Sequence, residues 1–288
     1  MLIKAFGITD VGLKREGNED AYLIHDELGL YIVADGMGGH LAGEVASRIA
    51  VEVISNCFQD WRDSETPEQF IFGPPDYSLT REGNYILGGI RLANRVIHEL
   101  ATEYESKYGG MGTTVTVLAA TPQLVIAANV GDSRLYIIRN GQIEMLSKDH
   151  TVVAEQVEMG IMTSEEAVVS PLKHVLTRNL GSAREVNAEV FEIVPADNDR
   201  YVLCTDGLTD LVSDNEILQM VEAEDNPEAL CRDFINKALK RGAHDNTTVI
   251  SVFISGHENG KSGAMKTAGL FLADTLLKAK KFVKGITP

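Results

Sequence analysis

Apolar residues recur along this chain with two spacings, one typical of strands and one typical of helices. Short runs rich in β-branched residues predict strands at 4–9, 20–34 (with a turn at 25–29), 113–121, 123–132, 133–146, 191–204 and directly after 246. Apolar residues three and four positions apart predict helices beginning near residue 39 and at 85–105, 214–223 and 227–241. Strands and helices cluster in runs instead of alternating. We therefore expect an α+β domain with largely antiparallel sheets whose faces are covered by helices.

Local signals refine this pattern. Asn140-Gly141 lies between two apolar runs and predicts a hairpin, because both residues accept the positive φ angles of a type I′ turn. Residues 60–83 contain prolines and glycines and separate the first predicted helix from the second. Residues 147–182 are less regular and predict short helices over the surface.

Acidic residues lie next to the ends of three predicted strands. Asp35-Gly36 and Asp206-Gly207 each end an apolar run, and Asp245 comes just before the last strand. A single Asp-Gly pair is usually a turn, because Asp caps its own backbone and Gly supplies positive φ. Three such acids at strand ends can instead converge in space, where their charges require a cation. Hard divalent ions such as Mg²⁺ and Mn²⁺ prefer oxygen ligands of this kind.

Composition narrows the class of protein. The 288 residues are 44% hydrophobic, enough for a sizeable core. The three cysteines form no CxxC pair, which argues against a disulfide framework or a zinc ribbon and favours the reducing cytoplasm. The first residues resemble no signal peptide, and no apolar run is long enough to span a membrane. The net charge of −16 disfavours a nucleic-acid partner.

Charge also divides the chain near Gly256. Residues 256–288 carry six lysines against two acids, so the negative charge is concentrated in the part before them. We expect a catalytic domain at 1–256, followed at 257–288 by a linker and a basic amphipathic helix. This helix would pack on its own domain, dock on a protein partner or lie on an anionic membrane surface. We expect a monomer.

Seven motifs in one order identify a resemblance. They are REGNEDAYLI, LYIVADGMGGHLAGEVAS, GMGTTVTVL, NVGDSRLYIIRNGQIEMLSKDHT, HVLTRNLGS, YVLCTDGLTD and HDNTTVI. Over about residues 1–256 the chain resembles the PP2C-type, metal-dependent protein serine/threonine phosphatases (the PPM family), and most closely their bacterial branch. The resemblance implies an α-β-β-α sandwich, with two antiparallel sheets flanked by helix pairs and a two-metal site at one end.

The resemblance also implies roles for individual residues. Asp35 would bridge two Mn²⁺ or Mg²⁺ ions, and Gly36 would offer its backbone oxygen to one of them. Asp206 and Asp245 would bind the other ion. Glu19 and Asp20 would orient metal-bound waters, Asp132 would help to bind a third ion, and Arg15 would grip the substrate phosphate. Taken alone, Asp132 would be read as a turn between two strands and Arg15 as part of a solvated turn.

The implied reaction is hydrolysis of phosphoserine and phosphothreonine in phosphorylated proteins, opposing a serine/threonine kinase. A water held between two divalent ions would lose a proton near neutral pH and attack phosphorus directly. Met37 stands where animal members have a histidine that is proposed to protonate the leaving group. His40 or a metal-bound water is an alternative donor.

Three questions stay open at the level of sequence. The family's flap segment corresponds to residues 147–182. Its basic residues Lys173, His174 and Arg178 would either steer phosphopeptides or form an ordinary solvated surface. The metal core does not choose the leaving group, so a two-metal hydrolase of small phosphoesters is an alternative function. A non-catalytic pseudophosphatase scaffold is another, although it would need a lost ligand.

Overall fold

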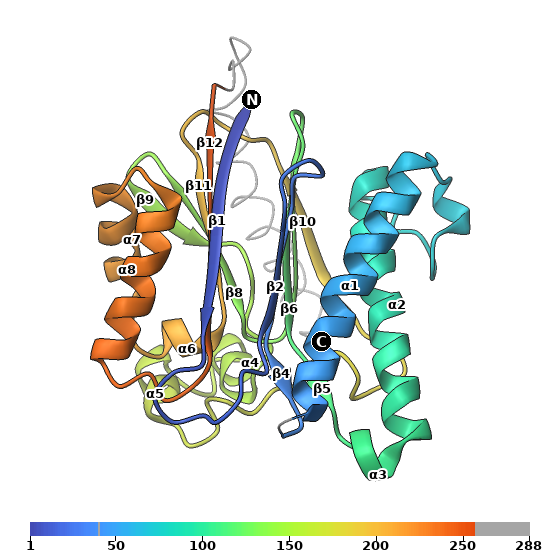
Figure 1. Cartoon of the computed structure of the whole chain (residues 1–288), viewed down its shortest axis with the longest axis horizontal. Coiled ribbons are helices and arrows are strands. Elements are labelled where there is room, and N and C mark those ends of the chain that lie inside the picture. Colours follow the sequence, from blue (N-terminus) through green and yellow to red (C-terminus); the bar gives the residue numbers. More distant parts are fainter. Residues whose placement is uncertain (40, 257–288) are drawn as a thin grey trace, which may run out of the picture.

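Two five-stranded antiparallel sheets form the centre of the molecule in this computed structural model, which describes residues 1–39 and 41–256 (Figure 1). The first sheet has the order β1 (Leu2–Asp10), β12 (Thr247–Ser255), β11 (Arg200–Cys204), β8 (Arg134–Arg139) and β9 (Gln142–Met145). The second has the order β10 (Glu189–Ile193), β7 (Val125–Val130), β6 (Val115–Ala120), β3 (Leu30–Ala34) and β2 (Ala21–His25). A short ribbon of β4 (Gly36–Met37) and β5 (Gly112–Thr113) lies at one end.

Helices cover the outer face of each sheet. The long pair α1 (Leu41–Asp63) and α2 (Arg81–Glu103) packs on the second sheet, and α2 continues into the short α3 (Glu105–Tyr108). The pair α7 (Asp214–Ala223) and α8 (Pro227–Lys240) packs on the first sheet (Figure 1). Short helices α4 (Val152–Glu158), α5 (Ser164–Val169) and α6 (Asp206–Thr209) lie at the same end as β4 and β5. A 3₁₀ turn, η1, spans Glu68–Phe70.

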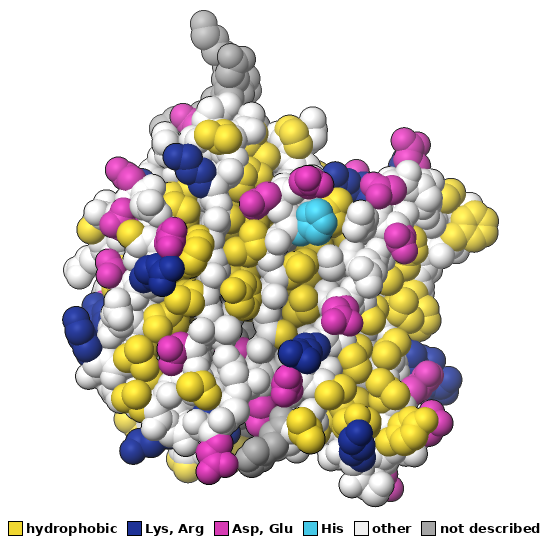
Figure 2. Space-filling model, viewed as in Figure 1, with side chains coloured by type: hydrophobic (Ala, Val, Ile, Leu, Met, Phe, Trp, Pro, Cys, Tyr) yellow, Lys and Arg dark blue, Asp and Glu magenta, His cyan; other side chains and the backbone are white. Residues whose placement is uncertain are grey.

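The core has three apolar layers. Tyr31, Val33 and Leu203 belong to the layer between the two sheets, and further layers lie under each helix pair. The central strands are therefore buried on both faces, which explains why they read as continuous apolar runs. On the face shown in Figure 2, hydrophobic side chains fill the space between the edge strands β1 and β2. This arrangement confirms the predicted α-β-β-α sandwich.

Local predictions hold with small shifts. The turn at 25–29 separates β2 from β3, and Asn140 and Gly141 have the predicted positive φ angles of 54° and 73°. The second helix begins at Arg81, earlier than the apolar spacing predicts, because the Thr80 side chain caps it by accepting from the Gly83 N–H. Residues 147–182 contain two short helices, as expected.

The segment between the first two helices is packed against them. Ile71 is buried, and a Cβ at Gly88 would lie 2.2 Å from its side chain. Arg91 donates to the carbonyl of Pro74, and Tyr85 donates to that of Thr66. Residues 60–83 therefore extend the α1–α2 layer.

Two predicted features lie outside the described residues. These are His40, the alternative proton donor, and the amphipathic segment 257–288 with its predicted partners. Across 1–39 and 41–256, no helix is both long and apolar enough to cross a membrane.

Candidate active site

A cavity of about 480 Å³ opens at the end of the sandwich where β4, β5 and α6 lie. Four aspartates reach it from four different parts of the chain. Asp35 follows β3, Asp132 lies in the β7–β8 turn, Asp206 begins α6, and Asp245 precedes β12. The cavity wall also contains Arg15, Glu19, Gly36, Met37, Thr114, His174, Asn179, Ser182 and Asn246. Seven of the eight predicted site residues thus line one cavity, and the eighth, Asp20, lies just behind it.

The two Asp-Gly pairs place their acids through close backbone packing. A Cβ at Gly36 would lie 2.2 Å from the Gly43 carbonyl oxygen and 2.4 Å from that of Glu19. A Cβ at Gly207 would lie 2.0 Å from the Asn246 carbonyl oxygen. Neither glycine has a positive φ, so neither pair is the ordinary Asp-Gly turn. Glycine is required here because the backbone after each acid packs directly against other backbone, that of residues 19 and 43 at Gly36 and that of residue 246 at Gly207.

Hydrogen bonds fix the backbone of Asp35. Its N–H donates to the Thr114 hydroxyl at 2.9 Å, and its carbonyl accepts from the Thr113 hydroxyl at 2.8 Å and from the Thr114 N–H at 2.9 Å. The Thr114 hydroxyl in turn contacts that of Ser133 at 2.7 Å. The end of β3 is therefore tied to the turn that carries Asp132.

Asn246, for which no role was predicted from the sequence, organises the other side of the cavity. Its side chain accepts from the Glu19 N–H at 2.8 Å and donates to the carbonyls of Val11 and Gly17 at 3.0 Å. It thereby holds the 11–19 loop against the start of β12. Arg15, on this loop, makes a 2.7 Å ion pair with Asp245. The only sequence signal for Asn246 was its position next to Asp245.

Asp20 is buried beneath the cavity. Its Oδ2 accepts from the hydroxyls of Thr248 at 2.6 Å and Thr205 at 3.1 Å. Its Oδ1 has no hydrogen-bond partner among the residues that the structure describes. Asp206 likewise has one buried oxygen, Oδ1, without a partner in the described part of the chain. Buried unpartnered carboxylate oxygens are costly unless another ligand satisfies them.

Burial and mutual repulsion shift the pKa values of the aspartates in and beneath the cavity. Burial, together with the charges of Asp20, Asp206, Asp132 and Asp245, raises the pKa of Asp35 well above its usual range. Burial also raises the pKa of Asp20 and that of Asp132 to about 7 each. For Asp206, burial acts in the same direction, but contact with His174 and a hydrogen bond to Asp35 hold its pKa below the usual value. The cavity thus concentrates more negative charge than its own cations balance.

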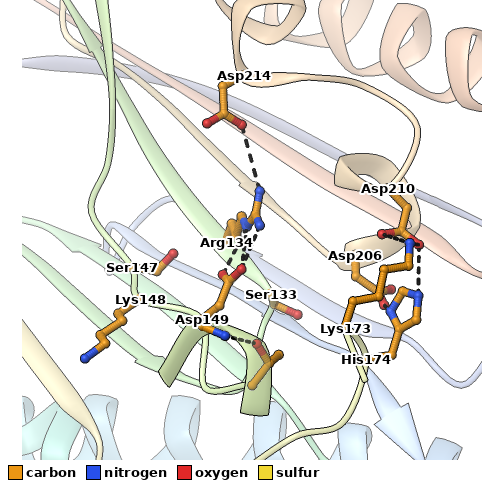
Figure 3. A network of polar contacts seen from close by, with 12 residues as sticks. Ser133, Arg134, Ser147, Lys148, Asp149, Lys173, His174, Asp206, Asp210 and Asp214 are labelled. Atoms are coloured by element: carbon orange, nitrogen blue, oxygen red, sulfur yellow. Dashed lines mark hydrogen bonds and ion pairs between the residues drawn. The ribbon is translucent and has the colours of Figure 1, made fainter. Parts of the chain in front are cut away.

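The basic residues of the flap contact acids of the molecule itself, and Figure 3 shows this for Lys173 and His174. His174 lies 3.5 Å from Asp206 and 3.4 Å from Asp210, and Lys173 lies 3.3 Å from Asp210. Contact with Asp206 raises the pKa of His174. Arg178 lies 3.7 Å from Glu189. The donor atoms of His174, Asp206 and Asp210 are close enough to share one ion. Asp210, the last residue of the YVLCTDGLTD motif, was not among the predicted site residues.

A second polar network supports the Asp132 turn. Arg134 binds both carboxylate oxygens of Asp149, as Figure 3 shows, with N–O distances from 2.6 to 3.1 Å. The His150 ring accepts from the Gly131 N–H at 3.0 Å. The motifs around 132 and 149 therefore form one structural unit, in which neither Arg134 nor Asp149 reaches the cavity wall.

Comparison with known proteins decides the family. The model of the protein phosphatase 2C family matches residues 14–242. The chain belongs to the PP2C family. The serine/threonine phosphatase stp of Listeria welshimeri is 34% identical to this chain, over 85% of this chain and 93% of its own length. The protein phosphatase PhpP of Streptococcus pneumoniae is 35% identical, over 85% of this chain and 95% of its own length. The predicted family and enzyme class, a protein phosphatase, are confirmed.

Solved PP2C structures agree with the fold. The Mycobacterium tuberculosis serine/threonine phosphatase PstP/Ppp superposes with a TM-score of 0.76 at 30% identity, covering 88% of this chain and all of that one. The catalytic domain of a serine/threonine protein phosphatase PstP in complex with two manganese ions gives a TM-score of 0.73 at 31% identity, covering 88% and 98%. Stp1 of Staphylococcus aureus gives 0.76 at 32%, covering 89% and 96%. The manganese-bound structure supports metal dependence for the family to which this chain belongs.

Proposed function

We propose that this protein hydrolyses phosphoserine and phosphothreonine in proteins with the help of two Mn²⁺ or Mg²⁺ ions, and that it opposes a serine/threonine kinase. The observation that carries the proposal is the convergence of Asp35, Asp132, Asp206 and Asp245 on one cavity. Family membership supports the reaction class, and a relative that holds two manganese ions supports the cofactor.

The donor set fits hard divalent cations. The four aspartates offer only oxygen, and Asp206 Oδ1, which has no partner among the residues that the structure describes, is a ligand atom that a cation would satisfy. Asp35, the Gly36 carbonyl, Asp206 and Asp245 would hold two ions. Such ions, when bound, would acidify a water and neutralise the phosphoryl oxygens. Mn²⁺ and Mg²⁺ share this ligand preference, so the donors alone do not choose between them.

The chain's own residues would bind and orient the substrate. Arg15 is half-exposed at the rim, with 52% of its side chain accessible, and its guanidinium can take two phosphate oxygens. In this structure Arg15 donates to Asp245, so a bound phosphate would compete with Asp245 for a guanidinium that is already held at the site. Glu19 lines the cavity, and Asp20 lies behind it. Both would accept hydrogen bonds that orient waters around the ions.

A third ion is the finer part of the proposal. Asp132 is near enough to Asp206 for the two charges to interact, and both line the cavity. If Asp132 holds a third, weaker ion, Asp132→Ala will lose most activity at low Mn²⁺ while keeping two bound ions in calorimetry. Full activity of this variant across a Mn²⁺ series would remove the third ion from the proposal.

The decisive experiment compares substrate classes. Purified protein is assayed with phosphoserine and phosphothreonine peptides and with small phosphoesters, in Mn²⁺, in Mg²⁺ and in chelator. We expect metal-dependent release of phosphate from the peptides and none in chelator. Preference for small phosphoesters would favour the alternative hydrolase. Absence of all turnover, with metal still bound, would favour the pseudophosphatase.

Asp206→Asn tests the assignment of the metal site. The amide keeps the shape of the side chain but removes the negative charge, so we expect no turnover and weaker Mn²⁺ binding by calorimetric titration. The same result is expected for Asp35→Asn. Unchanged metal affinity in both variants would place the ions elsewhere.

A further inference from the structure

A second cavity, of about 380 Å³, lies beside the candidate active site. Its walls come from the end of α2, which contributes His98 and Ala101, from Glu105 at the start of α3, and from the loop 109–111. Gly181 and Ser182, at the end of the flap segment, close its remaining side. Nothing in the predicted reaction uses this cavity.

The two cavities share a wall. Ser182 lines both of them. The loop that lines the second cavity also touches the first, because a Cβ at Gly38 would lie 2.9 Å from Met111 Cα and 3.2 Å from the Gly110 carbonyl oxygen. A chain leaving the acidic cleft past Ser182 therefore enters the second cavity directly.

Hydrogen bonds between its walls hold the second cavity in shape. His98 Nδ1 lies 2.9 Å from the Gly181 carbonyl oxygen, and Asn94 accepts from the Gly181 N–H at 2.8 Å. The Gly109 N–H donates to the Glu105 carbonyl at 2.9 Å. A preformed cavity costs its ligand little ordering free energy.

Its chemistry suits a polypeptide with a basic side chain. Gly109 and Gly110 are exposed and present bare backbone, Ala101 and Met111 are apolar, and Glu105 supplies an exposed carboxylate. Resting on the proposed function, we propose that this cavity binds the substrate chain next to the phosphorylated residue, and that Glu105 favours substrates with Arg or Lys at one flanking position. Glu105 is a specificity residue here and takes no part in the chemical step.

The test uses a set of phosphoserine peptides that carry a single Arg at each of the three positions on either side of the phosphoserine, with Ala elsewhere. We expect one position to raise kcat/KM by about two- to fivefold over the all-Ala peptide, the range of a solvent-exposed ion pair. Glu105→Lys should abolish that preference, mainly through KM. It should leave hydrolysis of p-nitrophenyl phosphate unchanged, because that small ester does not reach the second cavity.

Glu103→Lys is the matched control. It makes the same charge change two residues away on an exposed side chain that does not line the cavity, so it should keep the preference. Gly110→Asn is a second probe. Position 110 has a φ of 75°, which Asn tolerates, and an added Cβ meets open space, so the variant should fold and partly fill the cavity. It should lower kcat/KM for every peptide and spare p-nitrophenyl phosphate.

Equal rates for all Arg positions, or identical behaviour of Glu105→Lys and Glu103→Lys, would overturn the inference alone. Failure of the wild-type protein to hydrolyse any peptide in Mn²⁺ would overturn the proposed function as well.

Discussion

At the scale of single residues, the site combines acids that repel one another with one arginine at its edge. Arg15 donates to Asp245 in this structure, and this hydrogen bond raises the pKa of Arg15. The charges of Glu19 and Asp35 act in the same direction. The sequence alone allowed Arg15 to be part of a solvated turn. Its position on the cavity wall, on a loop fastened by Asn246, supports a phosphate-binding role.

Arg15→Ala should raise KM for a phosphopeptide more than it lowers kcat. Losing a charge-assisted contact to phosphate costs about 1.5–3 kcal/mol, so kcat/KM should fall by about ten- to a hundredfold. Steady-state kinetics on the peptide provide the measurement. Arg15→Lys is the control: it keeps the charge but not the planar fork, and it should recover only part of the loss. A variant with wild-type KM would show that Arg15 is only surface.

At the scale of elements, the site depends on how closely the strand ends and the first turn of α1 approach each other. Gly36 in β4 packs against Gly43 in α1, and a Cβ at Gly43 would lie 1.9 Å from a carboxylate oxygen of Glu19. These contacts hold the end of β3, the start of α1 and the Glu19 loop together. The packing therefore positions Asp35.

Gly36→Ala should therefore lower the free energy of unfolding by about 1–3 kcal/mol, because backbone atoms must move to admit the methyl group. Urea unfolding followed by circular dichroism measures this change. Gly17→Ala is the matched control. Its Cβ would meet no atom within 4 Å and its φ is not positive, so its stability should stay within about 0.5 kcal/mol of wild type. Equal stability of the two variants would contradict this account of position 36.

At the scale of the whole molecule, the acidic cavity makes stability depend on pH and on metal. Burial raises the pKa of Asp20 and Asp132 to about 7, whereas an unfolded Asp has a pKa near 3.9. Between these values the folded state binds more protons than the unfolded state. The free energy of unfolding of the metal-free protein therefore falls as pH rises from about 4 to about 7.

We expect the metal-free protein to melt at a lower temperature at about pH 8 than at about pH 5.5. Mn²⁺ should raise Tm most at the higher pH, because a cation favours ionised carboxylates. Thermal melts in chelator and in Mn²⁺ at both pH values give the comparison, and Asp132→Ala should reduce the pH dependence in chelator. A metal-free protein that melts higher at pH 8 would contradict the assigned cause.

The division of the chain at Gly256 is a prediction on the same scale. Strand β12 ends at Ser255 and completes the first sheet, so a protein truncated after Gly256 should keep both sheets. We expect such a protein to retain nearly full turnover of phosphopeptides and a nearly unchanged Tm. Unfolding or loss of activity would show that residues 257–288 belong to the catalytic domain.

The sequence by itself determined the layered fold, because buried strands and amphipathic helices leave distinct apolar spacings at 30–34, 115–120 and 227–240. It also selected the acids, since the family motifs contain Asp35, Asp206 and Asp245 in order.

Only the tertiary structure decided which residues that are distant in the sequence lie close together. The tertiary structure alone shows that Asn246 binds the Arg15 loop and that His174 contacts Asp206 and Asp210. It alone shows the second cavity beside Ser182. It also showed that Gly36 and Gly207 are needed for close backbone packing and that neither has the positive φ of an ordinary Asp-Gly turn. The spacing of apolar and polar residues along the sequence indicates which side chains share a face of one helix or strand. Contacts between residues more than two hundred positions apart, such as Arg15 with Asp245, arise only when distant strands pair, here β1 with β12.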